Sequence, residues 1–151
     1  MPISEDTTLG ENVVVHEPTN LWGCKVGDDT RIGAYADIGR GVVIGRNCRI
    51  QAHAFIPPGV VIGDNVFIGP RVTFLNIRYP GKHGVNWTEY IEGIYVCDGA
   101  VIGGEVTIMC GVIVGEGAFI AARALVLKDV PTEMQARGYP AKLYPITHRR
   151  S

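Results

Sequence analysis

The sequence lacks a charge imbalance and long apolar runs. Its 14 Lys and Arg residues against 15 Asp and Glu residues leave a formal net charge of −1 over 151 residues. Without a basic excess there is no general attraction to phosphate backbones or anionic membranes. No stretch reaches the roughly 18 apolar residues of a membrane span, and the beginning, MPISEDTTLGENVVVHEP, does not resemble a signal peptide. We therefore expect a cytoplasmic protein with no nucleic-acid or membrane partner.

Closely spaced cysteines and histidines are also missing. The four cysteines form no CxxC pair and have no histidine at ligand spacing: Cys24, Cys48, Cys97 and Cys110. The four histidines contain no pair with the spacing of a zinc site. We therefore expect reduced thiols and no metal.

What the sequence does contain is an aliphatic residue at every sixth position over most of its length. All but one of these residues are Ile or Val. The column consists of Val26, Ile32, Ile38, Ile44, Ile50, Ile56, Ile62, Ile68 and Phe74, and then Val96, Ile102, Ile108, Val114, Ile120 and Val126. A helix repeats near every 3.6 residues and a hairpin sheet every two, so neither template produces this period. A coil of short strands does.

A second column and a set of glycines follow the same period. Four residues after each aliphatic residue comes a small or β-branched side chain, with Arg78 the only exception. Glycine often follows the aliphatic residue directly, as at Gly27 and Gly45, which predicts tight corners. The β-branched residues suit flat faces between such corners. Stacking at about 4.8 Å per coil would bury both columns.

The pattern [Ile/Val]-Gly-x-x-[small]-x closely resembles the hexapeptide-repeat, or isoleucine-patch, acyltransferase family. This resemblance implies an all-β fold, a left-handed parallel β-helix with three hexapeptides per triangular coil. The handedness comes from the resemblance, because parallel crossovers are ordinarily right-handed. The resemblance also implies a homotrimer with active sites in clefts between neighbouring β-helices.

The chain divides into a β-helix over residues 1–131 and a cap and tail over residues 132–151. Within the β-helix the repeat is interrupted twice. A five-residue step from Leu21 to Val26 breaks the frame early. A long polar and aromatic loop, residues 75–95, interrupts the repeat later, and an insertion of this length in a regular solenoid suggests function. After Val130 the segment PTEMQARGYPAKLYP predicts a short helical cap that begins after Pro131 and ends at Gly138.

Three segments look like the subgroup of this family that N-acetylates nucleotide-linked amino sugars: VTFLNIRYP, AVIGGEVTIMCGVIVGEGAFIAARALVLKDVP and GYPAK. This resemblance implies acetyl-CoA as the co-substrate and a nucleotide-linked amino sugar as the acceptor. The chain departs from the subgroup in three places. Leu75 replaces a Thr, Ile77 replaces an Asp, and Gly103-Gly104-Glu105 replaces Gly-Ala-Asn. These departures bear on which amino sugar is used.

Acyl transfer from a thioester to an amine needs an unprotonated nucleophile, a proton acceptor and donors for the oxyanion. Asn76 matches the family's Asn and could orient the amine through its side-chain carbonyl. Glu89 falls on the far side of the loop, where relatives carry an acidic residue that holds or deprotonates the amine. His53, expected to point outward, or His83 in the loop could be the general base, because histidine exchanges protons near neutral pH. A solvated loop charge, a trimer contact and an exposed loop residue are the respective alternatives for Glu89, His53 and His83.

Coenzyme A would run along a groove between β-helices, where small corner residues let its amides reach backbone groups. Basic residues near the C-terminal end could meet its phosphates. The candidates are Gly103, Gly104, Ala121, Ala122, Arg137 and Lys142. Tight corners and solvated charges are the plain alternatives.

Three other functions use the same fold. Zinc carbonic anhydrases need three histidines, two of them four residues apart, which this chain lacks. O-acetylation of a sugar hydroxyl needs a stronger base, ideally a histidine with a carboxylate partner. A non-catalytic assembly protein would have no affinity for coenzyme A.

Overall fold

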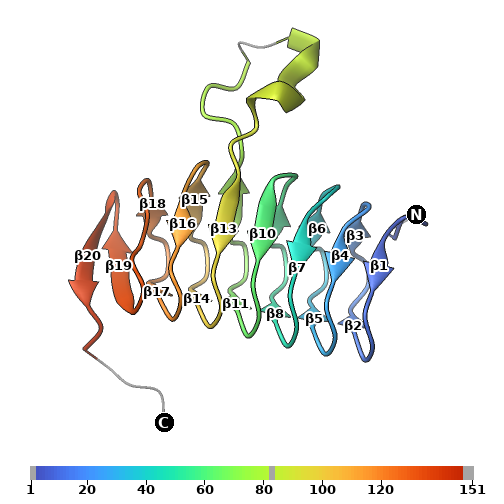
Figure 1. Ribbon diagram of the computed structural model, residues 1–151, viewed down its shortest axis with the longest axis horizontal. Coiled ribbons are helices and arrows are strands. Elements are labelled where there is room, and N and C mark those ends of the chain that lie inside the picture. The colour runs from blue at the N-terminus through green and yellow to red at the C-terminus, as the bar shows by residue number, and fades with distance from the viewer. Residues whose placement is uncertain (1–2, 82–83, 148–151) are drawn as a thin grey trace.

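The computed structural model of the chain describes residues 3–81 and 84–147. Short strands stack in three parallel sheets, which form the three walls of a prism (Figure 1). From β1 to β18, successive strands along the chain belong to successive walls, so that three strands complete one coil. The fold is the left-handed parallel β-helix that the family resemblance implies.

The strands of each wall are as follows. The first wall contains β1 (Thr8–Leu9), β4 (Lys25–Val26), β7 (Val43–Ile44), β10 (Val60–Ile62), β13 (Ile94–Val96) and β16 (Ile113–Val114). The second wall contains β2 (Val14–Val15), β5 (Arg31–Ile32), β8 (Arg49–Ile50), β11 (Phe67–Ile68), β14 (Val101–Ile102), β17 (Phe119–Ile120), β19 (Met134–Gly138) and β20 (Ala141–Pro145). The third wall contains β3 (Asn20–Leu21), β6 (Asp37–Ile38), β9 (Phe55–Ile56), β12 (Thr73–Leu75), β15 (Thr107–Met109) and β18 (Leu125–Val126). We call the turn from the first wall to the second the first corner. The turn from the second wall to the third is the second corner, and the turn from the third wall back to the first is the third corner.

Both sequence columns point into the prism and form its core. Register pairs such as Ile32 with Ile50 stack the aliphatic column, whose members are at most 2% exposed. The second column is equally buried, including Thr30, whose hydroxyl donates to the Gly45 carbonyl at 2.8 Å. Arg78, the exception in the sequence, has left the solenoid and is exposed in the loop. The period-six prediction of the core is therefore confirmed.

The glycines that follow the aliphatic residues serve coil stacking. Gly27 does not have a positive φ, but a Cβ there would lie 2.6 Å from the carbonyl carbon of Gly45 in the next coil. The positive φ falls two residues later, for example at Asp29 with φ 62°. The predicted corners are thus correctly placed, but these glycines are required by the close approach of backbones and not by the turn itself.

The long loop leaves the prism at the third corner without disturbing the walls. It connects β12 to β13, contains a short 3-10 helix, η1 (Gly84–Tyr90), and projects away from the solenoid (Figure 1). Below it the ladder continues, because Val61 pairs with Val43 on one side and Tyr95 on the other. No helix in the described part of the chain is both long enough and apolar enough to span a bilayer.

The C-terminal cap is a β-hairpin, so the predicted helical cap is wrong. Glu133 has φ 60°, which is not helical, and β19 then pairs in parallel with β17 while β20 folds back antiparallel on β19. Ala136 is 1% exposed and extends the inward column of the second wall. Pairing with the free edge of β17 outweighs the local helix propensity of this segment, because that edge offers hydrogen-bond partners. One of them is Ala121, whose amide donates to the Ala136 carbonyl at 2.9 Å.

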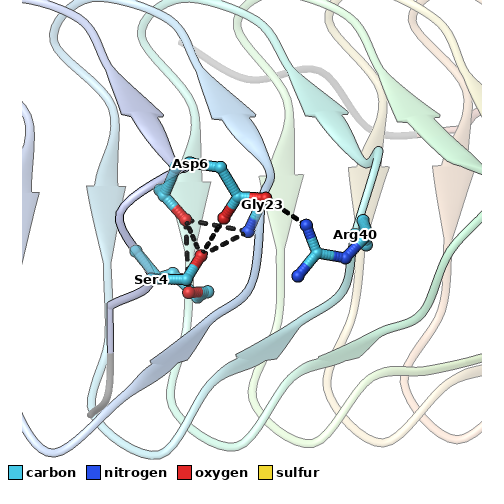
Figure 2. A network of polar contacts seen from close by, with 6 residues as sticks. Ser4, Asp6, Gly23 and Arg40 are labelled. Atoms are coloured by element: carbon cyan, nitrogen blue, oxygen red, sulfur yellow. Dashed lines mark hydrogen bonds and ion pairs between the residues drawn. The ribbon is translucent and has the colours of Figure 1, made fainter.

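A polar network fixes the other end of the chain (Figure 2). The amide of Gly23 donates to the Ser4 hydroxyl at 2.8 Å, and this hydroxyl donates to Asp6 at 2.6 Å. Asp6 also forms an ion pair with Arg40 on the next coil. The Ser4 hydrogen bond and the Arg40 charge lower the pKa of Asp6. The network ties the segment before β1 to the third corner of the first two coils.

Candidate active site

His53 lies at the second corner, where large side chains occupy the turning position of every regular coil. Residues with positive φ follow one another there from coil to coil: Tyr35 (64°), His53 (64°), Arg71 (58°), Glu105 (61°) and Arg123 (64°). The His53 side chain is exposed, as the sequence predicts. Its imidazole stacks on the Tyr35 ring, with centroids 4.9 Å apart and planes inclined by 8°. This corner therefore presents an ordered imidazole to its surroundings.

Asn76 lies at the root of the loop, at the third corner. Its side-chain Nδ2 donates to the carbonyl of Pro58 at 2.8 Å. Its main-chain carbonyl accepts a hydrogen bond from the main-chain amide of Glu92 at 3.0 Å. The two limbs of the loop are thus closed across Asn76 and Glu92. One Nδ2 hydrogen is engaged in this way, and the Oδ1 atom of this half-buried side chain can accept a hydrogen bond from a ligand.

A second polar cluster, which the sequence did not reveal, closes the loop from the other side. Arg78 Nε and Nη2 donate to the two carboxylate oxygens of Glu92 at 3.2 and 2.9 Å, and Nη2 also donates to the Cys110 carbonyl at 3.3 Å. The Cys110 thiol lies 3.6 Å from Glu92 Oε2. The Arg78 hydrogen bonds lower the pKa of Glu92, whereas burial, and then the Glu92 charge, raise the pKa of Cys110. The carboxylate therefore stays ionised and the thiol stays protonated at neutral pH.

Because of this cluster, the reactivity of the Cys110 thiol reports whether the contacts at the root of the loop are intact. In a Cys97→Ser background, which removes the one cysteine that is not buried, we expect Glu92→Ala to speed reaction of Cys110 with a disulfide reagent roughly tenfold, since it uncovers the thiol and removes a repelling charge. The release of thionitrobenzoate measures the rate. Glu89→Ala, a charge loss elsewhere in the loop, is the matched control and should leave the rate unchanged. Equal rates in both variants would mean that Glu92 does not shield the thiol.

The other candidate residues of the loop are less closely tied to Asn76. Glu89 lies in η1 with an exposed side chain. His83 lies outside the described residues. Trp87, on the same helical segment as Glu89, is 44% exposed. The acidic residue whose main chain bonds to Asn76 is Glu92, three residues beyond Glu89, and its carboxylate is directed to Arg78 and Cys110.

One protomer does not bring His53 and Asn76 together. His53 precedes strand β9 of the third wall, whereas Pro58, the partner of Asn76, follows it. Five residues of fully extended chain would span at most about 16 Å. The imidazole and the loop root thus lie at the two ends of one wall, at different corners.

The small residues proposed for coenzyme A gather at the second corner, beyond His53. Gly103 and Gly104 begin this corner in one coil, and Ala121 and Ala122 occupy the same places in the next. A Cβ on Gly103 would lie 2.8 Å from the amide nitrogen of Ala122, so coil packing alone requires that glycine. A hollow of about 510 Å³ opens alongside, lined by Glu105, Thr107, Arg123, Ala124 and Tyr139.

The two basic candidates lie on the hairpin, opposite one another in register. The Arg137 guanidinium lies 3.9 Å from the centre of the Tyr144 ring, which holds it in a cation–π contact. Lys142 lines a separate cavity of about 370 Å³ between β18 and the hairpin. Arg137 follows Ala136, which pairs with Ile120, so it continues the column of Gly103 and Ala121. Arg137 is the better placed of the two for a ligand along the second corner.

Sequence reasoning missed Tyr35, Arg78 and Glu92, although two of them carried a signal. Tyr35 occupies the same hexapeptide position as His53, so in-register stacking already placed the two rings together. Arg78 was the single break in the second column. Among the described residues, no group of three or more His, Cys, Asp or Glu side chains is arranged to hold a metal ion.

Two family models match the solenoid. The model described as bacterial transferase hexapeptide (six repeats) covers residues 23–58, and the hexapeptide repeat of succinyl-transferase covers residues 59–77. Together they span the coils before the loop, including the His53 corner and the Asn76 root.

Two acetyltransferases are similar to parts of the chain. Serine acetyltransferase 4 from Arabidopsis thaliana is 52% identical over 46 residues, which cover 30% of this chain and 13% of that protein. Galactoside O-acetyltransferase from Escherichia coli (strain K12) is 33% identical over 81 residues, or 52% of this chain and 40% of that protein. The chain thus spans less than half the length of either relative.

A solved structure matches nearly the whole chain. It is AntD, an N-acyltransferase from Bacillus cereus in complex with dTDP and 3-hydroxybutyryl-CoA, with a TM-score of 0.76 at 19% sequence identity. The match covers 92% of this chain and 81% of that one. At this identity the likeness concerns the fold.

Proposed function

From the hexapeptide-repeat models that match the coils before the loop, we propose that the chain is a homotrimeric, coenzyme A-dependent N-acyltransferase of the hexapeptide-repeat transferase family. The acyl group is acetyl, and the acceptor is the amino group of a nucleotide-linked amino sugar. We place the reaction in the cytoplasm. Support comes from the repeat itself, from acetyltransferase relatives, and from a similar fold in an N-acyltransferase bound to dTDP and an acyl-CoA.

The observation that carries the proposal is the placement of His53 and Asn76 at opposite ends of the third wall. Both side chains suit amine acylation, but one protomer holds them at different corners, with the width of the wall between them. Two protomers packed side by side could face the second corner of one toward the projecting loop of the other. The active site of this proposal is that cleft, with His53 from one protomer and Asn76, Glu92 and Glu89 from its neighbour.

In this cleft the acceptor amine attacks the thioester carbonyl carbon. Asn76 Oδ1 accepts a hydrogen bond from one N–H of the amine and so points the lone pair at the carbonyl, while the His53 imidazole takes the proton that the amine loses. When the tetrahedral intermediate collapses, the carbon–sulfur bond breaks, and the His53 imidazolium returns its proton to the leaving thiolate of coenzyme A. The pantetheine arm lies along the second corner beside Gly103, Gly104, Ala121 and Ala122, and Arg137 and Lys142 offer positive charge to its phosphates.

Thiol release from acetyl-CoA tests the reaction class. The panel contains nucleotide-linked 3-amino and 4-amino sugars, each paired with the matching hydroxyl sugar. Turnover with an amine alone supports the proposal. Turnover with a hydroxyl supports O-acetylation, the second candidate, which the match to galactoside O-acetyltransferase favours. Neither turnover nor binding of coenzyme A would leave a non-catalytic assembly protein.

Mixed trimers test whether the site is shared between protomers. If His53→Asn and Asn76→Ala subunits assemble at random in equal amounts, about one quarter of the clefts receive both native side chains. We therefore expect two nearly inactive variants to regain about one quarter of wild-type turnover when they are co-refolded. Each variant refolded alone is the first control. The second is His53→Asn mixed with the double variant, in which every cleft lacks His53 and no activity should return. Absence of recovery in the first mixture would place the whole site within one protomer.

A further inference from the structure

The His53 imidazole has no polar partner that fixes its orientation. Within residues 3–81 and 84–147 no side-chain hydrogen bond or ion pair involves its ring, and the side chain is exposed. The torsion that turns an imidazole about its Cβ–Cγ bond is broad, so an isolated exposed ring samples several orientations. A general base usually needs a third group to orient it. In this corner that group is not a carboxylate.

The contact that the ring does make is the stack on Tyr35. The centroids lie 4.9 Å apart with an 8° angle between the planes. Two features of the solenoid impose this geometry. Both residues have φ 64° at the same place in successive coils, and coils stack at about 4.8 Å, which is also the separation of stacked aromatic rings. The amide of His53 donates to the Ala34 carbonyl at 3.1 Å, which holds the two corners in register.

We propose that Tyr35 is a positioning residue for His53, which holds the imidazole plane parallel to its own ring and so aims the ring nitrogens away from the corner. This inference rests on the proposed function for its catalytic consequence, but the stack itself can be tested separately. A stacked ring opposes tilting of the imidazole plane and leaves both nitrogens at the ring edge free to exchange protons with an acceptor. Tyr35 thus performs through stacking what a carboxylate does through a hydrogen bond in other sites.

Proton NMR tests the stack without any substrate. The carbon-bound imidazole protons of His53, assigned through their loss in His53→Asn, lie over an aromatic face and should resonate upfield of those of the exposed His16. Tyr35→Asn should move them downfield, whereas Tyr35→Phe should not. Asparagine suits this corner because it tolerates positive φ, as Asn47 and Asn65 do at the first corner. Unchanged signals in Tyr35→Asn would overturn the proposal.

Kinetics test the catalytic consequence. Tyr35→Asn should lower kcat about tenfold with little change in the KM for acetyl-CoA, because a displaced base loses alignment, and Tyr35→Phe should restore it. In a His53→Asn background, Tyr35→Asn should have no further effect. Asp29→Asn, which introduces the same residue at a first-corner position with φ 62°, is the control and should keep wild-type turnover.

Three kinetic outcomes would contradict the positioning role. An equal loss with and without His53 would mean that Tyr35 acts on the fold or the substrate, and a loss in Tyr35→Phe would mean that the hydroxyl is the active group. Wild-type kcat in Tyr35→Asn would mean that the orientation of the ring does not matter. If no acceptor turns over, or if His53→Asn stays fully active, the proposed function fails instead, and the NMR shifts alone decide whether Tyr35 orders the ring.

Discussion

His53→Asn is expected to lower kcat for acyl transfer about 10²- to 10⁴-fold, the range that a positioned general base contributes. The affinity for acetyl-CoA should change little, because in the proposed site the imidazole contacts the amine and not the coenzyme. Asparagine is the replacement of choice since His53 has φ 64°, which asparagine adopts more readily than alanine does. Steady-state thiol release measures kcat and KM, and the melting temperature verifies that the fold is retained.

His16→Asn is the matched control for this variant. It removes another exposed histidine, from the far end of the second wall, and should leave kcat at the wild-type value. A His53→Asn enzyme within about threefold of wild type would rule out a base of the expected strength at this corner. Glu92 would then be the next group to test, because it lies at the loop root, where its amide bonds to the Asn76 main-chain carbonyl.

Phe74→Ala is expected to lower the free energy of unfolding by about 3–5 kcal/mol, as truncation of a fully buried phenylalanine usually does. Phe74 is 0% exposed and is the largest of the fully buried side chains. It lies in β12, in register with Ile108, at a place in the column where other coils use isoleucine or valine. Regular coils stacked above and below hold the walls apart, so the space left by the ring collapses only in part. Denaturant unfolding at fixed protein concentration measures the loss.

Leu75→Ala, at the adjacent position, is the control for Phe74→Ala. Its side chain faces outward and is 38% exposed, so truncation should cost less than about 1 kcal/mol. Similar losses for the two variants would mean that β12 is stabilised by its outer face and not by the core column.

The core could be predicted from sequence because this fold converts a tertiary contact into a local repeat. Ile32 packs against Ile50, its own equivalent in the next coil, so the spacing along the chain reports the packing directly. The same logic placed Cys48, 0% exposed, among the apolar side chains of the second column. It also predicted that His53 faces outward.

The sequence did not predict the structure correctly where the repeat stops, in the cap and in the loop. Residues 132–138 carry local helix signals, yet the exposed edge of β17 recruits them as a strand. The pairing of Arg78 with Glu92 depends on the path of the loop, which no period encodes. The main-chain hydrogen bond between Glu92 and Asn76 likewise depends on the path of the loop, and the role of Glu89 stays a prediction.

The strand pairing of the first wall continues without a break past the loop, so the third corner tolerates insertions between β12 and β13. Since Val61 pairs with Tyr95 as it does with Val43, the scaffold is indifferent to how many residues intervene between β12 and β13. The loop can lengthen, shorten or exchange its side chains while the rest of the solenoid keeps its packing. Under the proposed function, acceptor choice and scaffold stability are therefore separable traits, and the loop can change the first without lowering the second.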